Sequence, residues 1–221
     1  MTGARDSILG AIRKSLRRSS NDAADVAREA QAILGEARRF QPKFDDQSNR
    51  ARFIARATSE RLTATVDEVG EIGDAPAAVR AYLERLNLPL SIARPPNPTL
   101  HGLDWSGIET HEALTPNEPV GVNLADYAIA ETGTLVFTSR KESPTLFNYL
   151  PLHHIILVDG VNILRHPEEY WAKVRAAGNV QPRSINFVTG TSGTADIEGQ
   201  NIRGAHGPRF MHIIIYGERE T

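Results

Sequence analysis

Short apolar runs of strand length alternate with helical patterns from residue 62 to the end of the chain, and this alternation constrains the fold most strongly. Helical spacing of apolar residues occurs at 75–86 and 167–177. The runs that suit strands lie at 63–69, 90–93, 108–111, 125–130, 134–138, 154–158, 185–188 and 210–216. Because strands that alternate with helices are typical of α/β proteins, we predict a compact α/β core over 62–221 with a mostly parallel sheet.

The first 61 residues differ, because they show helical patterns and no run that suits a strand. Apolar residues recur at helical spacing from Ile8 to Leu16, again between Asp22 and Pro42, and a third time over 48–61. We predict an N-terminal helical arm over 1–61. An isolated amphipathic helix of this length is marginal in water, so we expect residues 1–45 to pack on the domain or on a second copy.

The composition excludes several classes of function. Cysteine is absent, which excludes disulfides, a thiolate nucleophile and an iron–sulfur cluster held by thiolates of this chain. The net charge of −2, without a basic stripe that includes aromatic residues, predicts no nucleic-acid partner. The histidines lack metal-ligand spacing, so we expect no metal. No apolar run could span a bilayer and the charged start is unlike a secretory signal, so we expect a cytoplasmic protein without a membrane partner.

The first candidate site is Glu131-Thr132-Gly133-Thr134, which separates two apolar runs. In open α/β sheets ligands bind beyond the carboxyl ends of strands, and this segment lies where one run ends. Glu131 could act as a base or a nucleophile, or could accept a hydrogen bond from a ligand hydroxyl. A tight turn at Gly133 with a solvated or paired Glu131 fits the same residues, and both interpretations stay open.

The second candidate is the loop of small residues at 190–194, which follows the run 185–188. We predict that a helix begins at Thr194, and free N–H groups at its start would attract an anion. The loop lacks a Walker lysine, and Asp196 near the positive helix end argues against a highly charged phosphate. A simple helix cap explains the pattern equally well. The candidate ligand-binding residues of this loop are Gly190, Ser192, Gly193 and Thr194.

The third candidate is His206, which lies between two glycines and before Pro208. This setting is neither helical nor typical of a core, so His206 could be presented to a site as a proton shuttle or hydrogen-bond donor. A turn residue with a solvated ring is the alternative. His212 lies inside an apolar strand and suits the core. The loop 140–149, with its charges and aromatic residues, fits either a lid or a packed excursion.

Three segments resemble the lactate-utilisation (LUD) domain family: 125–137 (ADYAIAETGTLVF), 150–158 (LPLHHIILV) and 187–208 (FVTGTSGTADIEGQNIRGAHGP). The length and the helical start resemble the protein C branch of that family. The resemblance implies a fold like ribose-5-phosphate isomerase and the CoA-transferases. It also implies a role in bacterial oxidation of L-lactate to pyruvate, beside iron–sulfur proteins of the same operon. The resemblance favours functional roles for Glu131, Thr194, Asp196 and His206, with Asp196 as a ligand-binding residue. Thr132, Gly133 and Thr134 of the first candidate site are candidate ligand-binding residues as well.

The resulting hypothesis is a non-redox subunit or accessory protein of an L-lactate-oxidising iron–sulfur complex. The sequence shows no flavin or nicotinamide fingerprint, so the clusters are expected on partner subunits and no activity is expected from the isolated chain. The alternative is a free-standing enzyme of isomerase or CoA-transferase type that acts on a small anionic metabolite. An interaction module that uses the basic arm, and a homo-oligomer, also stay open.

The site hypothesis places three polar segments, 131–134, 190–196 and 206–208, around one cleft. Glu131 and His206 would act on a small carboxylate whose anionic end lies at the loop 190–194. This loop lacks the proline and the basic side chain that the resemblance leads us to expect. Backbone N–H groups, or Arg203 and Arg209, would therefore hold the anion.

Overall fold

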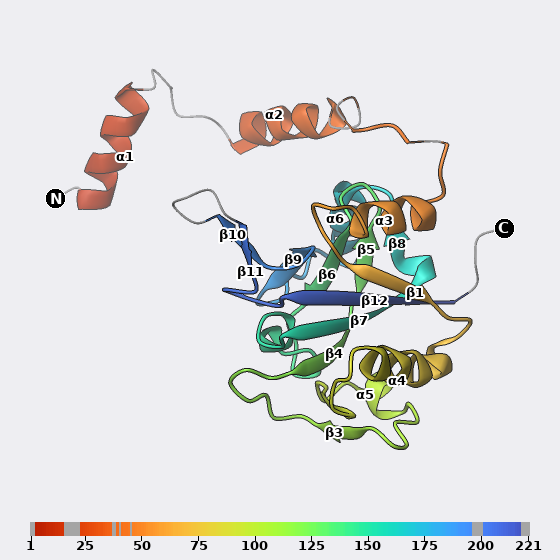
Figure 1. Cartoon of the computed structure of the whole chain (residues 1–221). Coiled ribbons are helices and arrows are strands. Elements are labelled where there is room, and N and C mark those ends of the chain that lie inside the picture. Colours follow the sequence, from red (N-terminus) through yellow and green to blue (C-terminus); the bar gives the residue numbers. More distant parts are fainter. Residues whose placement is uncertain are drawn as a thin grey trace. The chain divides into compact units, whose positions relative to one another are not determined.

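The computed structural model describes residues 3–15, 23–36, 39, 41–44, 46–195 and 201–217, in two compact units, Met1–Lys43 and Phe44–Thr221 (Figure 1). The first unit contains α1 (Ala4–Ser15) and α2 (Ala23–Glu36). The predicted N-terminal helices are therefore present. The arm was expected to extend to residue 61, and its last helix, α3 (Asn49–Ala57), lies in the second unit.

The second unit is built on a six-stranded sheet in which every pair of neighbouring strands is parallel. This confirms the predicted, mostly parallel α/β architecture. The two longest strands of this sheet lie side by side, and apart from its last residue each consists of residues that are buried or apolar, as expected where both faces of a sheet are covered. In sheet order the strands are β1 (Thr65–Glu68), β12 (Phe210–Tyr216), β7 (His153–Asp159), β4 (Val120–Leu124), β2 (Ser91–Ala93) and β3 (Glu109–His111).

One face of this sheet is covered by α4 (Ala75–Arg85) and α5 (Pro98–His101). Pro76 brings a fixed φ to the first turn of α4, and Val79 and Leu83 face the sheet from one side of the helix, fully buried. In Figure 1 both helices lie on the same side of β4 and β7.

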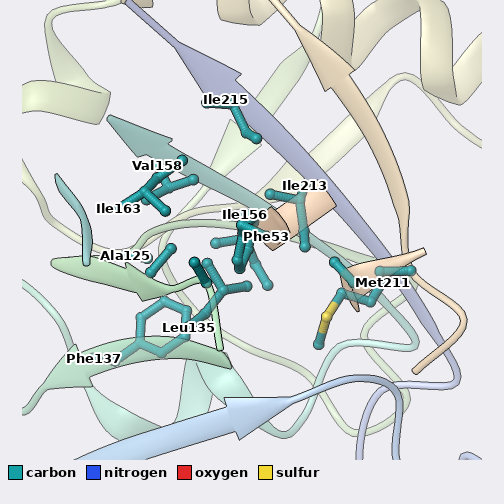
Figure 2. Close-up of a cluster of buried hydrophobic side chains, with 14 of the residues drawn as sticks. Phe53, Ala125, Leu135, Phe137, Ile156, Val158, Ile163, Met211, Ile213 and Ile215 are labelled. Carbon is teal, nitrogen blue, oxygen red and sulfur yellow. The ribbon is translucent and has the colours of Figure 1, made fainter. Parts of the chain in front are cut away.

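The opposite face is covered by α3 and by a second, four-stranded sheet of mixed direction. Its strands, in order, are β8 (Ile163–Leu164), β5 (Tyr127–Ile129), β6 (Thr134–Thr138) and β9 (Ile185–Thr189). The side chains between the two sheets form one apolar cluster in which Phe137 and Leu135 meet Ile156 and Ile213 (Figure 2). Helix α6 (Pro167–Ala176) covers the outer face of the smaller sheet through Tyr170.

Several elements differ from the sequence-based expectation. The prediction that a helix begins at Thr194 is wrong, because Thr194 lies in β10 (Gly193–Ala195), which pairs with β11 (Asn201–Arg203) in an antiparallel hairpin. Strand β4 was not expected, because Gly121 and Asn123 are weak strand formers. The remaining short elements are the 3-10 helices η2 (Ile72–Asp74), η3 (Thr145–Asn148) and η4 (Gly160–Asn162).

Candidate functional site

The turn that carries Glu131 lies at one edge of the four-stranded sheet, where β5, β8 and β9 all end. Strand β8 is parallel to β5, and β9 runs in the same direction because both β5 and β9 are antiparallel to β6. The Glu131 N–H group donates to the Arg165 carbonyl beyond β8. Gly133 has a φ of +70°, and a Cβ there would lie 3.1 Å from the Ala57 backbone nitrogen. Only glycine therefore allows the turn to pack against the end of α3.

Glu131 is paired with His166, the residue that precedes α6. Its Oε2 lies 2.7 Å from the His166 Nδ1, and the side chains are 20% and 11% exposed. A carboxylate accepts and cannot donate, so the His166 Nδ1–H group donates this hydrogen bond. The pair thus joins a base and a proton carrier in a half-closed setting.

A chain of three hydroxyl groups lies beside this pair. The Thr132 Oγ1 is 2.7 Å from the Thr134 Oγ1, which is 2.6 Å from the Thr189 Oγ1. Thr134 is buried and Thr189 is exposed, so the chain leads from the sheet interior to the surface at the same edge. Hydroxyl groups both donate and accept, and can therefore adapt to a polar ligand.

Phe44 packs over His166 and joins two arginines to the site. The two rings meet edge to face at 5.4 Å between centroids. The Cζ atoms of Arg165 and Arg52 lie 4.6 and 5.0 Å from the centre of the Phe44 ring. Positive charge therefore surrounds the ring that covers the imidazole of His166.

In the loop after β9, two of the backbone N–H groups that we expected to bind an anion already donate to carbonyl groups of the chain. The Thr191 N–H group donates to the Leu62 carbonyl and the Ser192 N–H group to the Pro208 carbonyl. The side chain of Arg203 hydrogen bonds to the Thr191 and Thr63 hydroxyls. Gly193 and Thr194 lie in β10, and Asp196 lies outside the described residues. The anion-binding role of Gly190, Ser192, Gly193 and Thr194 stays a prediction.

His206 lies before β12, at the amino edge of the parallel sheet, whereas carboxyl edges were expected to hold the site. It is exposed and lines a cavity of about 430 Å³ together with Asn117, Leu146, Tyr149, Leu150, Leu152, Gly204, Ala205 and Gly207. A Cβ at Gly207 would lie 3.2 Å from the Ser192 Cβ. The third segment therefore touches the second, but Glu131 does not line this cavity. A joint role of Glu131 and His206 stays a prediction.

Asp126 marks the opposite end of the four-stranded sheet from Glu131. Its Oδ2 accepts hydrogen bonds from the N–H and hydroxyl groups of Thr138, and its Oδ1 accepts one from Arg140. These bonds fix the start of the loop 140–149 to the sheet. Asp126 also borders a cavity of about 450 Å³ next to Tyr170 and Lys173.

The histidines of β7 and β12 are enclosed. Burial lowers the pKa of His154 to about 3 and that of His212 to about 4. His153 and His154 point to opposite faces, as expected: His153 meets the Tyr82 hydroxyl at 2.9 Å, whereas His154 stacks on Phe137 from the other sheet. The prediction that His212 is a core residue is confirmed.

Sequence reasoning missed His166 and Arg52. Thirty-five positions separate His166 from Glu131, and Arg52 lies on a helix far upstream, so no local motif joins them. The only sequence signal was the position of His166 directly before Pro167, which starts a helix beyond a strand-like run.

Two absences hold for the part of the chain that the structure describes. There, no three or more histidine, aspartate or glutamate side chains gather in a way that could hold a metal ion. Over the same residues, no helix is both long and apolar enough to cross a membrane.

Comparisons with known proteins place these residues in a wider group. Residues 117–216 match the model of the LUD domain. Lactate utilization protein C of Geobacillus kaustophilus is 33% identical over 103 residues, which are 45% of this chain and 43% of that protein. The Bacillus licheniformis protein of the same name is 31% identical over 129 residues, 56% and 54% of the two chains. The matches thus span about half the length of these relatives.

A solved structure has the same fold. The crystal structure of a DUF162 family protein from Deinococcus radiodurans superposes with a TM-score of 0.58 and 20% sequence identity. The superposition covers 77% of this chain and 99% of that one. At this identity the likeness concerns the fold alone.

Proposed function

We propose that this chain, whose residues 117–216 belong to the LUD domain family, takes part in the utilisation of L-lactate as a non-redox subunit or accessory protein. Relatives called lactate utilization protein C support this role. Cysteine is absent, so iron–sulfur clusters of the complex would reside on partner subunits encoded with it. The contribution of this chain is then to bind a small carboxylate or to hold the partners together.

The pairing of Glu131 with His166 is the observation that carries this proposal. It lies inside the LUD match, at the edge where three strands of the small sheet end, and it is half-buried. An imidazole that a carboxylate holds in one orientation is suited to receive a proton from a ligand hydroxyl. L-lactate is a small acid with such a hydroxyl, so the site suits the metabolite that the names of the relatives indicate.

Growth of bacteria on L-lactate tests the role. A strain that lacks this gene and any second lactate oxidase should fail to grow on L-lactate, and the wild-type gene should restore growth. Glu131→Gln removes the charge and keeps the shape, so it should not restore growth. Glu168→Gln, on the exposed first turn of α6, is the matched control and should restore it. If Glu131→Gln and His206→Asn both restored growth, their proposed roles would be wrong.

Purification of the native protein tests the partnership. A tagged chain from cells grown on L-lactate should bring down an iron–sulfur protein, visible as brown colour and bound iron. Recovery of the tagged chain alone, under conditions in which growth depends on it, would argue against a stable complex.

A free-standing enzyme is the second candidate, and the same Glu131–His166 pair favours it. A carboxylate and an imidazole at this distance suit general acid–base chemistry. The purified chain would then isomerise a sugar phosphate, or transfer coenzyme A from an acyl-CoA to a free carboxylic acid, without any partner. Turnover that is lost in Glu131→Gln would support this candidate over the subunit role.

A further inference from the structure

We propose that Glu131, His166 and Arg52 together bind a small 2-hydroxy acid, with Arg52 holding its carboxylate and His166 accepting a hydrogen bond from its hydroxyl. This inference rests on the proposed function, because it names the ligand class of the same sheet edge. Its basis is the surroundings of the Phe44 ring. The imidazole of His166 meets this ring edge to face, with 5.4 Å between the centroids, and the Arg52 Cζ lies 5.0 Å from the centre of the same ring.

Glu131 determines which nitrogen of His166 is available to a ligand. The Nδ1–H group donates to Glu131, so the lone pair of the neutral ring is on Nε2. Among the described residues, the structure shows no partner for this Nε2. An imidazole that a carboxylate orients through one nitrogen, with the other nitrogen left as acceptor, is the arrangement that receives a hydroxyl proton in many enzymes.

Arg52 provides the positive charge. Its Nε atom is buried and has no hydrogen-bond partner among the residues that the structure describes. Such a buried N–H group has lost its bonds to water, which is unfavourable until an acceptor arrives. A carboxylate matches the planar fork of a guanidinium. Arg50 on the same helix differs, because it binds Glu68 and the Gly217 carbonyl.

Phe44 fills the space that the ligand would use. It is 4% exposed, and its ring is surrounded by Arg52, Arg165 and the edge of His166. The cationic and the imidazole groups therefore face one volume that is now apolar. We infer that the ligand displaces this ring, so that a smaller side chain at position 44 should make entry easier.

Binding of L-lactate and propionate to the full chain, measured by ligand-observed NMR titration, tests the site. Propionate has the carboxylate and lacks the hydroxyl. Arg52→Gln should weaken the binding of both acids by about tenfold or more, because the charge-assisted bond is lost. His166→Gln should weaken L-lactate binding several-fold and leave propionate binding unchanged. Arg175→Gln, exposed near the end of α6, is the control and should bind both acids like the wild type.

Two further variants distinguish a loss of binding from a loss of fold. Arg52→Lys keeps the charge and should retain part of the affinity, and Phe44→Leu should tighten the binding of both acids several-fold. The proposal is overturned if the wild type binds neither acid, or if Arg52→Gln binds both as tightly as Arg175→Gln does. Growth on L-lactate that needs the chain but tolerates Arg52→Gln would reject this site and leave the proposed function standing.

Discussion

The two sheets of the α/β unit differ in how far water reaches the polar side chains at their centres and ends. In the six-stranded parallel sheet, His154 and His212 are 1% and 0% exposed, enclosed by helices on one face and by the second sheet on the other. In the four-stranded sheet, Glu131 and Thr132 are half-buried at an edge and hydrogen bond to other polar side chains there. The first sheet excludes water from these two histidines, and the second presents Glu131 and Thr132 at its edge.

This difference assigns different tasks to the two sheets. Parallel strands that are covered on both faces bury much apolar surface, which is the main source of stability. A smaller sheet with open strand ends can place polar groups where a ligand reaches them. We therefore expect substitutions in the large sheet to lower the free energy of unfolding, and substitutions at the edge around Glu131 to affect function more than stability.

The largest expected effect is a cavity between the two sheets. Ile156 is fully buried in the cluster that joins them (Figure 2), so Ile156→Ala should lower the free energy of unfolding by about 2–5 kcal/mol. Urea denaturation followed by circular dichroism measures this loss. Val161→Ala, at a residue that is 80% exposed, is the control and should stay within about 0.5 kcal/mol of the wild type. Equal, small losses in both variants would contradict a core shared by the sheets.

The second expected effect is a loss of stability in acid, and it depends on the enclosed histidines. In the unfolded chain these rings have a pKa near 6.5, whereas burial lowers the pKa of His154 to about 3 and of His212 to about 4. Below pH 6.5 the unfolded state therefore binds more protons at these histidines than the folded state does. The free energy of unfolding should fall by on the order of 1 kcal/mol per pH unit for each histidine as the pH decreases from 6.5 toward 4.

Melting temperatures between pH 8 and pH 4 check this dependence on acid. His154→Leu removes one titrating ring and keeps an apolar side chain, so its melting temperature should fall less steeply between pH 6.5 and pH 4. His101→Leu removes a ring from a half-exposed position on α5 and serves as the control. An identical slope in His154→Leu and the wild type would show that His154 is not the source.

The smallest effect on stability is expected at the edge of the small sheet. Thr134→Val removes the middle hydroxyl of the chain from Thr132 to Thr189 and should cost about 1 kcal/mol. Its effect on growth on L-lactate should nevertheless exceed that of Thr145→Val, which removes a hydroxyl that lies 3.2 Å from the Ser184 Oγ. Denaturation and growth rates measure the two quantities. Equal growth of the two variants would assign the hydroxyl chain to structure alone.

The comparison also explains which elements the sequence revealed. Strands β6 and β12 were expected with their observed bounds, because β-branched runs there end at clear polar boundaries. Strand β4 was not predicted, because Gly121 is a weak strand former. The fold requires glycine there, since a Cβ would lie 2.4 Å from the Cγ of Pro151, thirty residues away. The side-chain NH₂ group of Asn123 likewise finds an acceptor, the Asn148 Oδ1, only in the fold. Such residues contradict local propensity and are explained by tertiary packing alone.

The helix expected at Thr194 failed for a related reason. The small residues of 190–194 suit a capped helix and an edge hairpin equally well, and local propensity cannot separate them. Hydrogen bonds from Thr191 and Ser192 to the carbonyls of Leu62 and Pro208 fix the loop instead. Both acceptors lie far from the loop or beyond the hairpin, so the spacing of the sequence does not contain them.

The sequence by itself determined the α/β class, the parallel sheet, the turn that presents Glu131 and the resemblance to the LUD domain, because periodicity and short motifs are local properties. Only the tertiary structure decided the partner of that carboxylate. Strand β8 runs parallel beside β5 and places His166 against Glu131, while His206 is carried to the amino edge of the other sheet. Pairing across thirty-five residues depends on how strands are ordered in a sheet, and strand order follows from packing rather than from any one segment.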